Sequence, residues 1–262
     1  MTALSGSDLR LEYGDRVVAD GLDIELPAGR VSVLVGPNAC GKSTALRALG
    51  RLLAPAAGVV RLDGEPIDRL PGRELARRLA LLPQSPLAPD GITVRELVTR
   101  GRTPHQTWWR QWSRADEEVV DRAMAATGTA ELADRTLDEL SGGQRQRVWI
   151  AMALAQDTRV LLLDEPTTFL DLAYQIDVLE LVAELNRRDG TTVVMVLHDL
   201  NQACRYADHL IAMRAGAVVA AGPPAEVMTA GLVREVFGLD CRVIACPVTG
   251  APMVVPEART TR

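Results

Sequence analysis

The chain has 262 residues, of which 47% are hydrophobic and 24% charged, and its formal net charge is −5. This length and composition fit a globular chain that folds as one large α/β domain or two small ones. The negative balance argues against non-specific nucleic-acid binding, which normally requires a basic surface. No apolar run approaches the roughly 20 residues needed to span a bilayer, and Met1–Arg10 is too polar for a secretory signal. We therefore expect a cytosolic chain whose membrane role, if it has one, requires a partner.

The basic residues are unevenly divided: 28 of the 29 are arginine and one, Lys42, is lysine. A planar arginine guanidinium cannot replace a compact lysine ammonium at every site, so Lys42 is a candidate for a functional residue. The alternative is that a single lysine remains by chance. The four cysteines are expected to be reduced. Cys241 and Cys246 form an isolated C-x4-C pair, which favours small buried hydrophobes over a zinc site.

In chain order, residues 7–35 and Gly58–Leu62 predict short antiparallel strands, and glycine–aspartate pairs at 14–15 and 63–64 are turn signals. Four short apolar runs predict buried parallel strands. These runs are Val31–Val35, Leu79–Leu82, Val160–Leu163 and Val193–Leu197. Each is followed by polar or glycine residues: Gly36, Gln84, Asp164 with Glu165, and His198. Ligands bind at the carboxyl ends of strands in open α/β sheets, so we expect these groups to converge on one edge.

Helical periodicity predicts a helix over Thr44–Leu53. Capping-box patterns at Thr93–Glu96 and Ser113–Asp116 predict two further helix starts. Residues 86–156 show helix signals without a clear strand, and residues 225–262 look irregular. We therefore predict a single domain over 1–262, with a core of about 1–85 and 157–225, a helical subdomain at 86–156 and a C-terminal tail at 226–262.

The segment Gly36–Ser43 fits the pattern G-x4-G-K-[ST], between a predicted strand and a predicted helix. Its glycines allow backbone N–H groups to turn toward phosphate oxygens, and the following helix N-terminus favours negative charge. Lys42 would reach the β and γ phosphates, and Ser43 would offer a hydroxyl to Mg²⁺. The motif predicts nucleotide binding.

An apolar strand, Leu161–Leu163, ends in two carboxylates. Asp164 would hold Mg²⁺, and Glu165 would orient or deprotonate the water that attacks the γ-phosphate. An acidic loop start is the alternative, which the neighbouring phosphate motif makes less attractive.

The segment Leu140–Gln144 reads L-S-G-G-Q. Ser141 and Gln144 form a helix-start pattern, so Gly142 and Gly143 would expose N–H groups at a second anion site. An ordinary glycine-rich cap is the alternative for a bare S-G-G.

These motifs together resemble the nucleotide-binding subunit of an ATP-binding-cassette (ABC) transporter, over nearly the whole chain. The resemblance implies an α/β P-loop NTPase fold, with a RecA-like core, an antiparallel β subdomain and an inserted helical subdomain. It also implies Mg²⁺-dependent ATP hydrolysis. Catalytic roles fall on Glu165, His198 and Gln84, and contacts to Mg²⁺ on Ser43, Gln84 and Asp164. The residues that match the family's ATP contacts and dimer contact are Tyr13, Gly36, Pro37, Asn38, Ala39, Cys40, Gly41, Lys42, Ser43, Thr44, Ser141, Gly142, Gly143, Gln144 and Asp171.

Three of these positions have plainer interpretations. Tyr13, matched to the aromatic that stacks on adenine, could be a core residue. Gln84 could be a turn residue, and His198 could be a satisfied histidine at a strand end. Phe169 departs from the family pattern, because many relatives have a small residue there. His105 and His209 receive no role and are expected to be surface or packing residues.

The resemblance implies a homodimer in which two chains pair head to tail around two ATP molecules, each held between one P-loop and the partner's signature. It further implies integral membrane permease subunits, an indirect substrate-binding protein, no nucleic acid, and a place at the cytoplasmic face of the cell membrane. Trp108, Trp109 and Trp112 form a cluster that could be an interface or the insert's own small core.

Some segments resemble the importers of ferric siderophores, a branch that also contains haem and vitamin B12 importers. The segments are Leu82–Gln84, Gly101–Gln106, Asp164–Asp171, Tyr174–Glu180 and Pro247–Val255. Because no residue contacts the cargo, the siderophore assignment rests on analogy. An ABC ATPase without a transporter is the alternative, but Lys42 and Ser141 are 99 positions apart with no heptad run between them. A kinase or GTPase leaves the signature unexplained, and an exporter subunit would usually be fused to membrane spans.

Overall fold

The computed structural model describes residues 2–106, 112–168 and 170–257. The chain divides into two compact units, one formed by Met1–Arg69 with Thr192–Arg262 and the other by Leu70–Thr191. Among the described residues, every helix is too short or too polar to cross a bilayer. The helical subdomain was predicted from helix signals, and this division by compactness does not test its bounds of 86–156, which stay a prediction. The regular elements described between 86 and 156 are helices.

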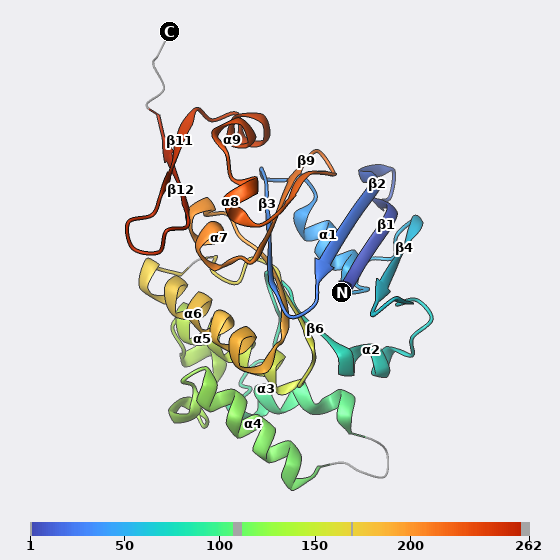
Figure 1. Cartoon of the computed structure of the whole chain (residues 1–262). Helices are drawn as coiled ribbons and strands as arrows, with labels where there is room; N and C mark the ends of the chain where they lie inside the picture. Colours follow the sequence, from blue (N-terminus) through green and yellow to red (C-terminus); the bar gives the residue numbers. More distant parts are fainter. Residues whose placement is uncertain (1, 107–111, 169, 258–262) are drawn as a thin grey trace. The chain divides into compact units, whose positions relative to one another are not determined.

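The first unit contains an antiparallel sheet with the strand order β2-β1-β4-β5 (Figure 1). Its strands are β1 (Thr2–Tyr13), β2 (Arg16–Pro27), β4 (Ala57–Leu62) and β5 (Glu65–Pro66). β1 and β2 are each 12 residues long and joined at a left-handed glycine, Gly14. The antiparallel strands predicted in this region are confirmed, although these two are longer than expected.

The same unit contains four further strands in the order β10-β9-β3-β8. β3 (Val31–Val35) runs parallel to both β8 (Thr192–Val196) and β9 (His209–Arg214), and β10 (Ala217–Gly222) is antiparallel to β9. Every residue of β3 and β8 is buried, as continuous apolar runs predict for strands covered on both faces. The last strand was predicted one residue too late, at Val193–Leu197, since β8 begins at Thr192 and ends at Val196.

Helix α1 (Lys42–Leu49) follows β3. The predicted helix over Thr44–Leu53 was wrong at both ends, because α1 begins two residues earlier and stops before Gly50. Arg51 takes a left-handed φ of 58°, which breaks the helical path. Leu52 therefore lies outside the helix and is 63% exposed.

The C-terminal part of the first unit is folded rather than irregular, which corrects the expectation for residues 225–262. It contains α8 (Pro224–Val227), α9 (Ala230–Phe237) and an antiparallel hairpin of β11 (Cys241–Ala245) and β12 (Pro252–Pro256). Thr229 caps α9 and the left-handed Gly238 ends it. The hairpin is bound to α7 (Leu200–Tyr206) by Asn201, whose amide accepts from Val254 N at 2.7 Å and donates to Val254 O at 3.3 Å.

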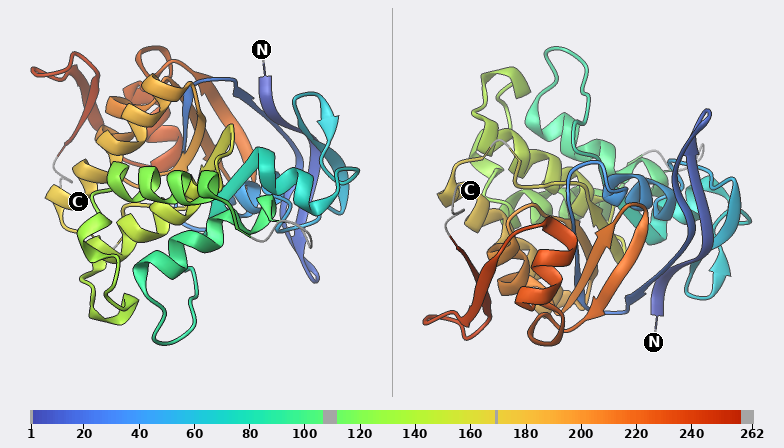
Figure 2. Two further views of the ribbon diagram at one scale, coloured as in Figure 1. Left: turned by 90° about the horizontal axis from the view of Figure 1, so that it is seen from below. Right: turned by 90° about the horizontal axis from the view of Figure 1, so that it is seen from above.

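The second unit pairs two parallel buried strands with several helices. β6 (Leu79–Leu82) and β7 (Val160–Leu163) coincide with the predicted runs. The helical elements are α2 (Gly72–Arg78), α3 (Val94–Thr99), η1 (Arg100–His105), α4 (Arg114–Ala126), η2 (Ala130–Leu132), η3 (Leu137–Glu139), α5 (Gly142–Ala155) and α6 (Leu172–Asp189). α3, α4 and α5 pack against one another (Figure 2). Both predicted capping boxes, at Thr93 and Ser113, are confirmed.

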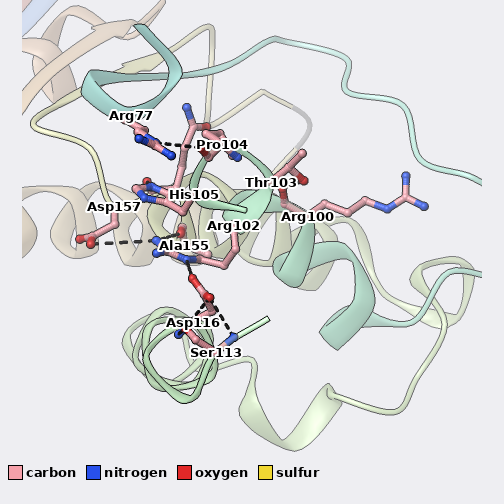
Figure 3. A network of polar contacts seen from close by, with 11 residues as sticks. Arg77, Arg100, Arg102, Thr103, Pro104, His105, Ser113, Asp116, Ala155 and Asp157 are labelled. Carbon is pink, nitrogen blue, oxygen red and sulfur yellow. Dashed lines mark hydrogen bonds and ion pairs between the residues drawn. The ribbon is translucent and has the colours of Figure 1, made fainter. Parts of the chain in front are cut away.

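A buried ion pair joins three of these helical elements (Figure 3). Arg102 Nε lies 2.9 Å from Asp116 Oδ1, and both side chains are 7% exposed. Arg102 also donates to the carbonyl of Ala155, the last residue of α5, at 2.9 Å. Burial alone would raise the pKa of Asp116, but hydrogen bonds from Ser113 and Arg102 and the charge of Arg102 lower it below its ordinary value.

Candidate functional site

The loop between β3 and α1 is shaped by residues that need unusual backbone geometry. A Cβ at Gly36 would clash with the Met213 carbonyl oxygen, and Gly41 has a φ of 107°. Ala39 has a left-handed φ of 60°, which is uncommon for a residue with a side chain. Lys42 is 4% exposed, and its Nζ donates to Gly36 O and Pro37 O at 2.9 Å each. The lone lysine thus folds back over its own loop.

Helix α1 begins in a way that suits an anion. Its N-cap is the left-handed Gly41, no described side chain caps it, and its first turn contains no acidic residue. The backbone N–H groups at a helix start carry partial positive charge. The loop and the helix start therefore fit a phosphate group, because the described first turn of α1 contributes no acidic side chain.

The register of β3 and β8 places His198 at the same sheet edge as the loop. Leu34 is paired with Val196 in parallel, and Leu197 N donates to Leu34 O at 3.2 Å. Gly36 directly follows β3, and His198 lies two residues after the end of the neighbouring β8. His198 is exposed. Tyr13, at the end of β1 in the same unit, is 45% exposed, so it is not a core residue.

The second unit brings together another set of predicted residues at the ends of β6 and β7. Leu82 is paired with Leu163, and Asp164 N donates to Leu82 O at 2.9 Å. Gln84 Nε2 donates to Glu165 Oε2 at 2.6 Å. Glu165 has a left-handed φ of 54°, a strained geometry that is often found at functional sites. Asp164 is 2% exposed.

The remaining predicted residues lie at two helix starts of the second unit. Ser141 Oγ accepts from Gln144 N at 3.3 Å, and Gln144 Oε1 accepts from Ser141 N at 3.1 Å, so the predicted capping pattern at α5 is confirmed. Asp171 caps α6 by accepting from Tyr174 N at 3.1 Å.

Comparison with protein families shows to which family a chain with these motifs belongs. Residues 19–168 match the family model for ABC transporters, which is more than half of the chain. The chain belongs to the ABC transporter family. It is an ATP-binding subunit of this family, and its activity is ATP hydrolysis.

Curated relatives align with this ABC subunit over nearly its full length. It is 56% identical over 259 residues to the achromobactin transport ATP-binding protein CbrD of Dickeya dadantii, covering 99% of this chain and 96% of that protein. It is 56% identical over 257 residues to the ferric enterobactin transport ATP-binding protein FepC of Escherichia coli, covering 98% and 95%. The hemin import ATP-binding protein HmuV of Streptomyces coelicolor is 47% identical over 251 residues, covering 95% and 88%.

Solved structures agree with this assignment. A chain from an inward-facing ABC transporter of the metal-chelate type superposes with a TM-score of 0.85 at 28% identity, covering 99% of both chains. A dimeric bacterial ABC transporter cassette superposes with a TM-score of 0.74 at 27% identity, covering 84% of this chain and 98% of that one. ABC cassettes thus form dimers, and the predicted P-loop ABC fold is confirmed.

The predicted site residues of this ABC subunit divide between the two units. The first unit contains Tyr13, residues 36–44 and His198, and the second contains Gln84, Asp164, Glu165, residues 141–144 and Asp171. Phe169, Trp108 and Trp109 lie outside the described residues; Trp112 is 43% exposed.

Sequence reasoning missed one contact of the carboxylate, since Thr168 Oγ1 donates to Glu165 Oε2 at 3.0 Å. The only available signal was its spacing of three residues from Glu165.

Proposed function

We propose that ATP hydrolysis by this chain, with Mg²⁺ as cofactor, powers import of a ferric siderophore through a separate membrane permease. The chain would act at the cytoplasmic face of the membrane, in contact with that permease and indirectly with a substrate-binding protein. The observation that carries the ATPase chemistry is the pairing of Gln84 with Glu165 at the ends of adjacent strands. The cargo assignment rests on two relatives, each 56% identical, that are named as transport ATP-binding proteins for achromobactin and ferric enterobactin.

In this proposal the P-loop, residues 36–44, binds the phosphates of ATP, and Tyr13 stacks on adenine. The ammonium of Lys42 would exchange its two carbonyl partners for phosphate oxygens, which are stronger acceptors for a buried cation. Ser43, Gln84 and Asp164 are the residues that would hold Mg²⁺. Their hydroxyl, amide and carboxylate oxygens are the hard ligands this ion prefers, and the bound ion would neutralise charge on the β and γ phosphates.

Glu165 would position the attacking water and accept its proton. Gln84 and Thr168 both donate to its Oε2, so the carboxylate is oriented before the nucleotide arrives. Such preorganisation lowers the barrier because the catalytic group need not be ordered during the reaction. His198 would contact the γ-phosphate.

The signature residues, Ser141 to Gln144, would bind the ATP of a second copy of the chain. The expected assembly is a head-to-tail homodimer around two ATP molecules, in which Asp171 contributes to the dimer contact. The dimeric structural neighbour supports the pairing of cassettes. Closure around ATP and opening after hydrolysis would then move the permease.

The central test of the chemistry is Glu165→Gln. The amide keeps the size of the side chain but cannot accept a proton, so we expect nucleotide binding to remain and phosphate release to fall by at least about 100-fold. A matched control is Glu184→Gln, which makes the same change at an exposed position of α6. Phosphate release by the Glu165 variant at the wild-type rate would refute the assigned role.

The cargo is tested separately by uptake in cells deleted for this gene. Labelled ferric siderophore uptake should return with the wild-type chain and with Glu184→Gln, but not with Glu165→Gln. If deletion leaves iron uptake intact while the purified chain still hydrolyses ATP, the siderophore assignment fails and the ATPase assignment stands. Haem and vitamin B12 would then be tested in the same strains.

A further inference from the structure

The two signature glycines have different surroundings. A Cβ built at Gly143 would lie 3.0 Å from Cγ and 3.1 Å from Cδ2 of the Tyr174 ring, closer than real Cβ atoms normally approach. A Cβ at Gly142 would meet no described atom within 4 Å. A side chain at position 143 would therefore press on the Tyr174 ring, which would have to shift by a few tenths of an ångström, whereas position 142 faces open space among the described residues.

Tyr174 is fixed in place by contacts on two helices. Its backbone N–H donates to Oδ1 of Asp171, the N-cap residue of α6, at 3.1 Å. On α5, the Arg147 guanidinium carbon lies 5.9 Å from the centre of the Tyr174 ring, within cation–π range. Arg147 Nε is buried and makes no hydrogen bond within the described part of the chain, so the ring face contributes favourable electrostatics there.

Arg147 and Gly143 are four residues apart on α5, and therefore lie on one face of that helix. The tyrosine ring meets both of them, while its backbone is held by Asp171. One side chain thus connects the cap of α6 to the start of α5, two segments separated by more than twenty-five positions in the sequence.

We infer that Tyr174 is a positioning residue that holds the signature glycines in a fixed relation to Asp171. This inference rests on the proposed function, because it assumes that the signature binds the ATP of a second copy. Loss of the ring should therefore weaken ATP-driven pairing of two chains. Binding of nucleotide by the P-loop of a single chain should not change, since we assign Tyr174 to the signature and not to that loop.

The test uses the full chain with Glu165→Gln, in which hydrolysis is blocked and the ATP-bound dimer should accumulate. Dimer formation is measured by sedimentation against ATP concentration, and nucleotide binding by a fluorescent ATP analogue at low protein concentration. Tyr174→Ala should raise the ATP concentration for half-dimerisation about tenfold, because both the ring packing and the cation–π contact are lost. Tyr174→Phe, which keeps the ring, should remain within about twofold of its parent.

A double-mutant cycle tests the contact itself. Gly143→Ala should abolish most ATP-driven dimerisation, and Gly143→Ala combined with Tyr174→Ala should recover part of it, because the added methyl group then has room. If the double variant is no better than Gly143→Ala, the second glycine is required by the nucleotide and not by Tyr174.

The possible failures are distinguishable. If the Glu165→Gln parent does not dimerise with ATP, the proposed function fails, and this inference fails with it. If the parent dimerises and Tyr174→Ala does so at the same ATP concentration, the inference alone is overturned. Weakened binding of the analogue by single Tyr174→Ala chains would also overturn it, since the loss would then be general rather than confined to the signature.

Discussion

The starts of α1 and α5 are both expected to meet phosphate groups, but they are built in opposite ways. α5 begins with a complete capping box, in which Ser141 and Gln144 exchange side-chain and backbone hydrogen bonds. α1 begins at a left-handed glycine with no side-chain cap. Among the described α-helices of eight residues or more, α1 is the one that lacks such a cap.

The capping box is an ordinary structural device in the second unit. The same reciprocal pattern occurs at Thr93, Ser113 and Thr136. The box at Ser141 therefore does not by itself indicate a ligand; of the four boxes, it is the one followed by two glycines, Gly142 and Gly143. α1, by contrast, begins at a left-handed glycine without a side-chain cap among the described residues, a start that is compatible with an anion.

The largest effect is expected at the start of α1, from Lys42→Arg. The buried ammonium reaches two carbonyls of its own loop, and a planar guanidinium is too large to occupy that position. ATP turnover should fall on the order of 1000-fold, comparable to removing a cation from a phosphoryl-transfer site. Phosphate release by the purified chain measures this.

The matched control is Arg47→Lys, the reverse exchange on the same helix. Arg47 lies 3.5 Å from the Tyr13 hydroxyl, a weak contact, so turnover should stay within about twofold. Similar losses in both variants would show that α1 is sensitive to any exchange of basic residues and that Lys42 has no special role.

A smaller effect, on stability, is expected at the start of α4, where Asp116 of the capping box forms an ion pair with the buried Arg102. Asp116→Ala leaves Arg102 buried without its carboxylate, which should lower the free energy of unfolding by about 3 kcal/mol. The control is Asp121→Ala on the same helix; its ion pair with Arg95 is 2.9 Å long but exposed, so its loss should cost less than about 1 kcal/mol. Urea unfolding at neutral pH compares the two.

The pH dependence follows from the lowered pKa of Asp116. The Asp116 carboxylate contributes fully to the free energy of unfolding above the pKa that this group has in the unfolded chain. This stabilisation is lost as the pH falls through the lower pKa of the folded chain, so it disappears only below about pH 4. Asp116→Ala should therefore reduce the acid dependence of stability, while Asp121→Ala should retain it. Equal losses at neutral pH would contradict the assigned burial effect.

Periodicity and motif spacing were sufficient for the strands that carry the site to within one residue, because each is a short and largely buried apolar run. The pairing of Gln84 with Glu165 could also be anticipated, since both come two residues after paired strand positions. The end of α1 could not, because Leu52 and Leu53 continue the helical pattern past Gly50 and only the left-handed Arg51 stops it.

The C-terminal hairpin and the Tyr174 contact were missed for a different physical reason. The contact of the hairpin with α7 and the contact of the Tyr174 ring depend on pairs far apart in the sequence, Asn201 with Val254 and Gly143 with Tyr174. A local pattern contains no information about such pairs. The glycines of the signature looked equivalent in sequence, and the position of the aromatic ring separates Gly143, which faces the Tyr174 ring, from Gly142, which faces open space among the described residues.

The smallest effect tests the comparison of helix starts most directly, by removing the same cap from two helices. Ser141 Oγ and Thr93 Oγ1 each accept from the N3 backbone N–H at 3.3 Å. Ser141→Ala and Thr93→Ala should therefore each lower the free energy of unfolding by about 1 kcal/mol. ATP turnover should fall about tenfold only for Ser141→Ala, because its hydroxyl would also lose a contact to the partner's nucleotide. Equal turnover in the two variants would mean that Ser141 is a cap like the others, and that recognition at α5 comes from the glycine backbone alone.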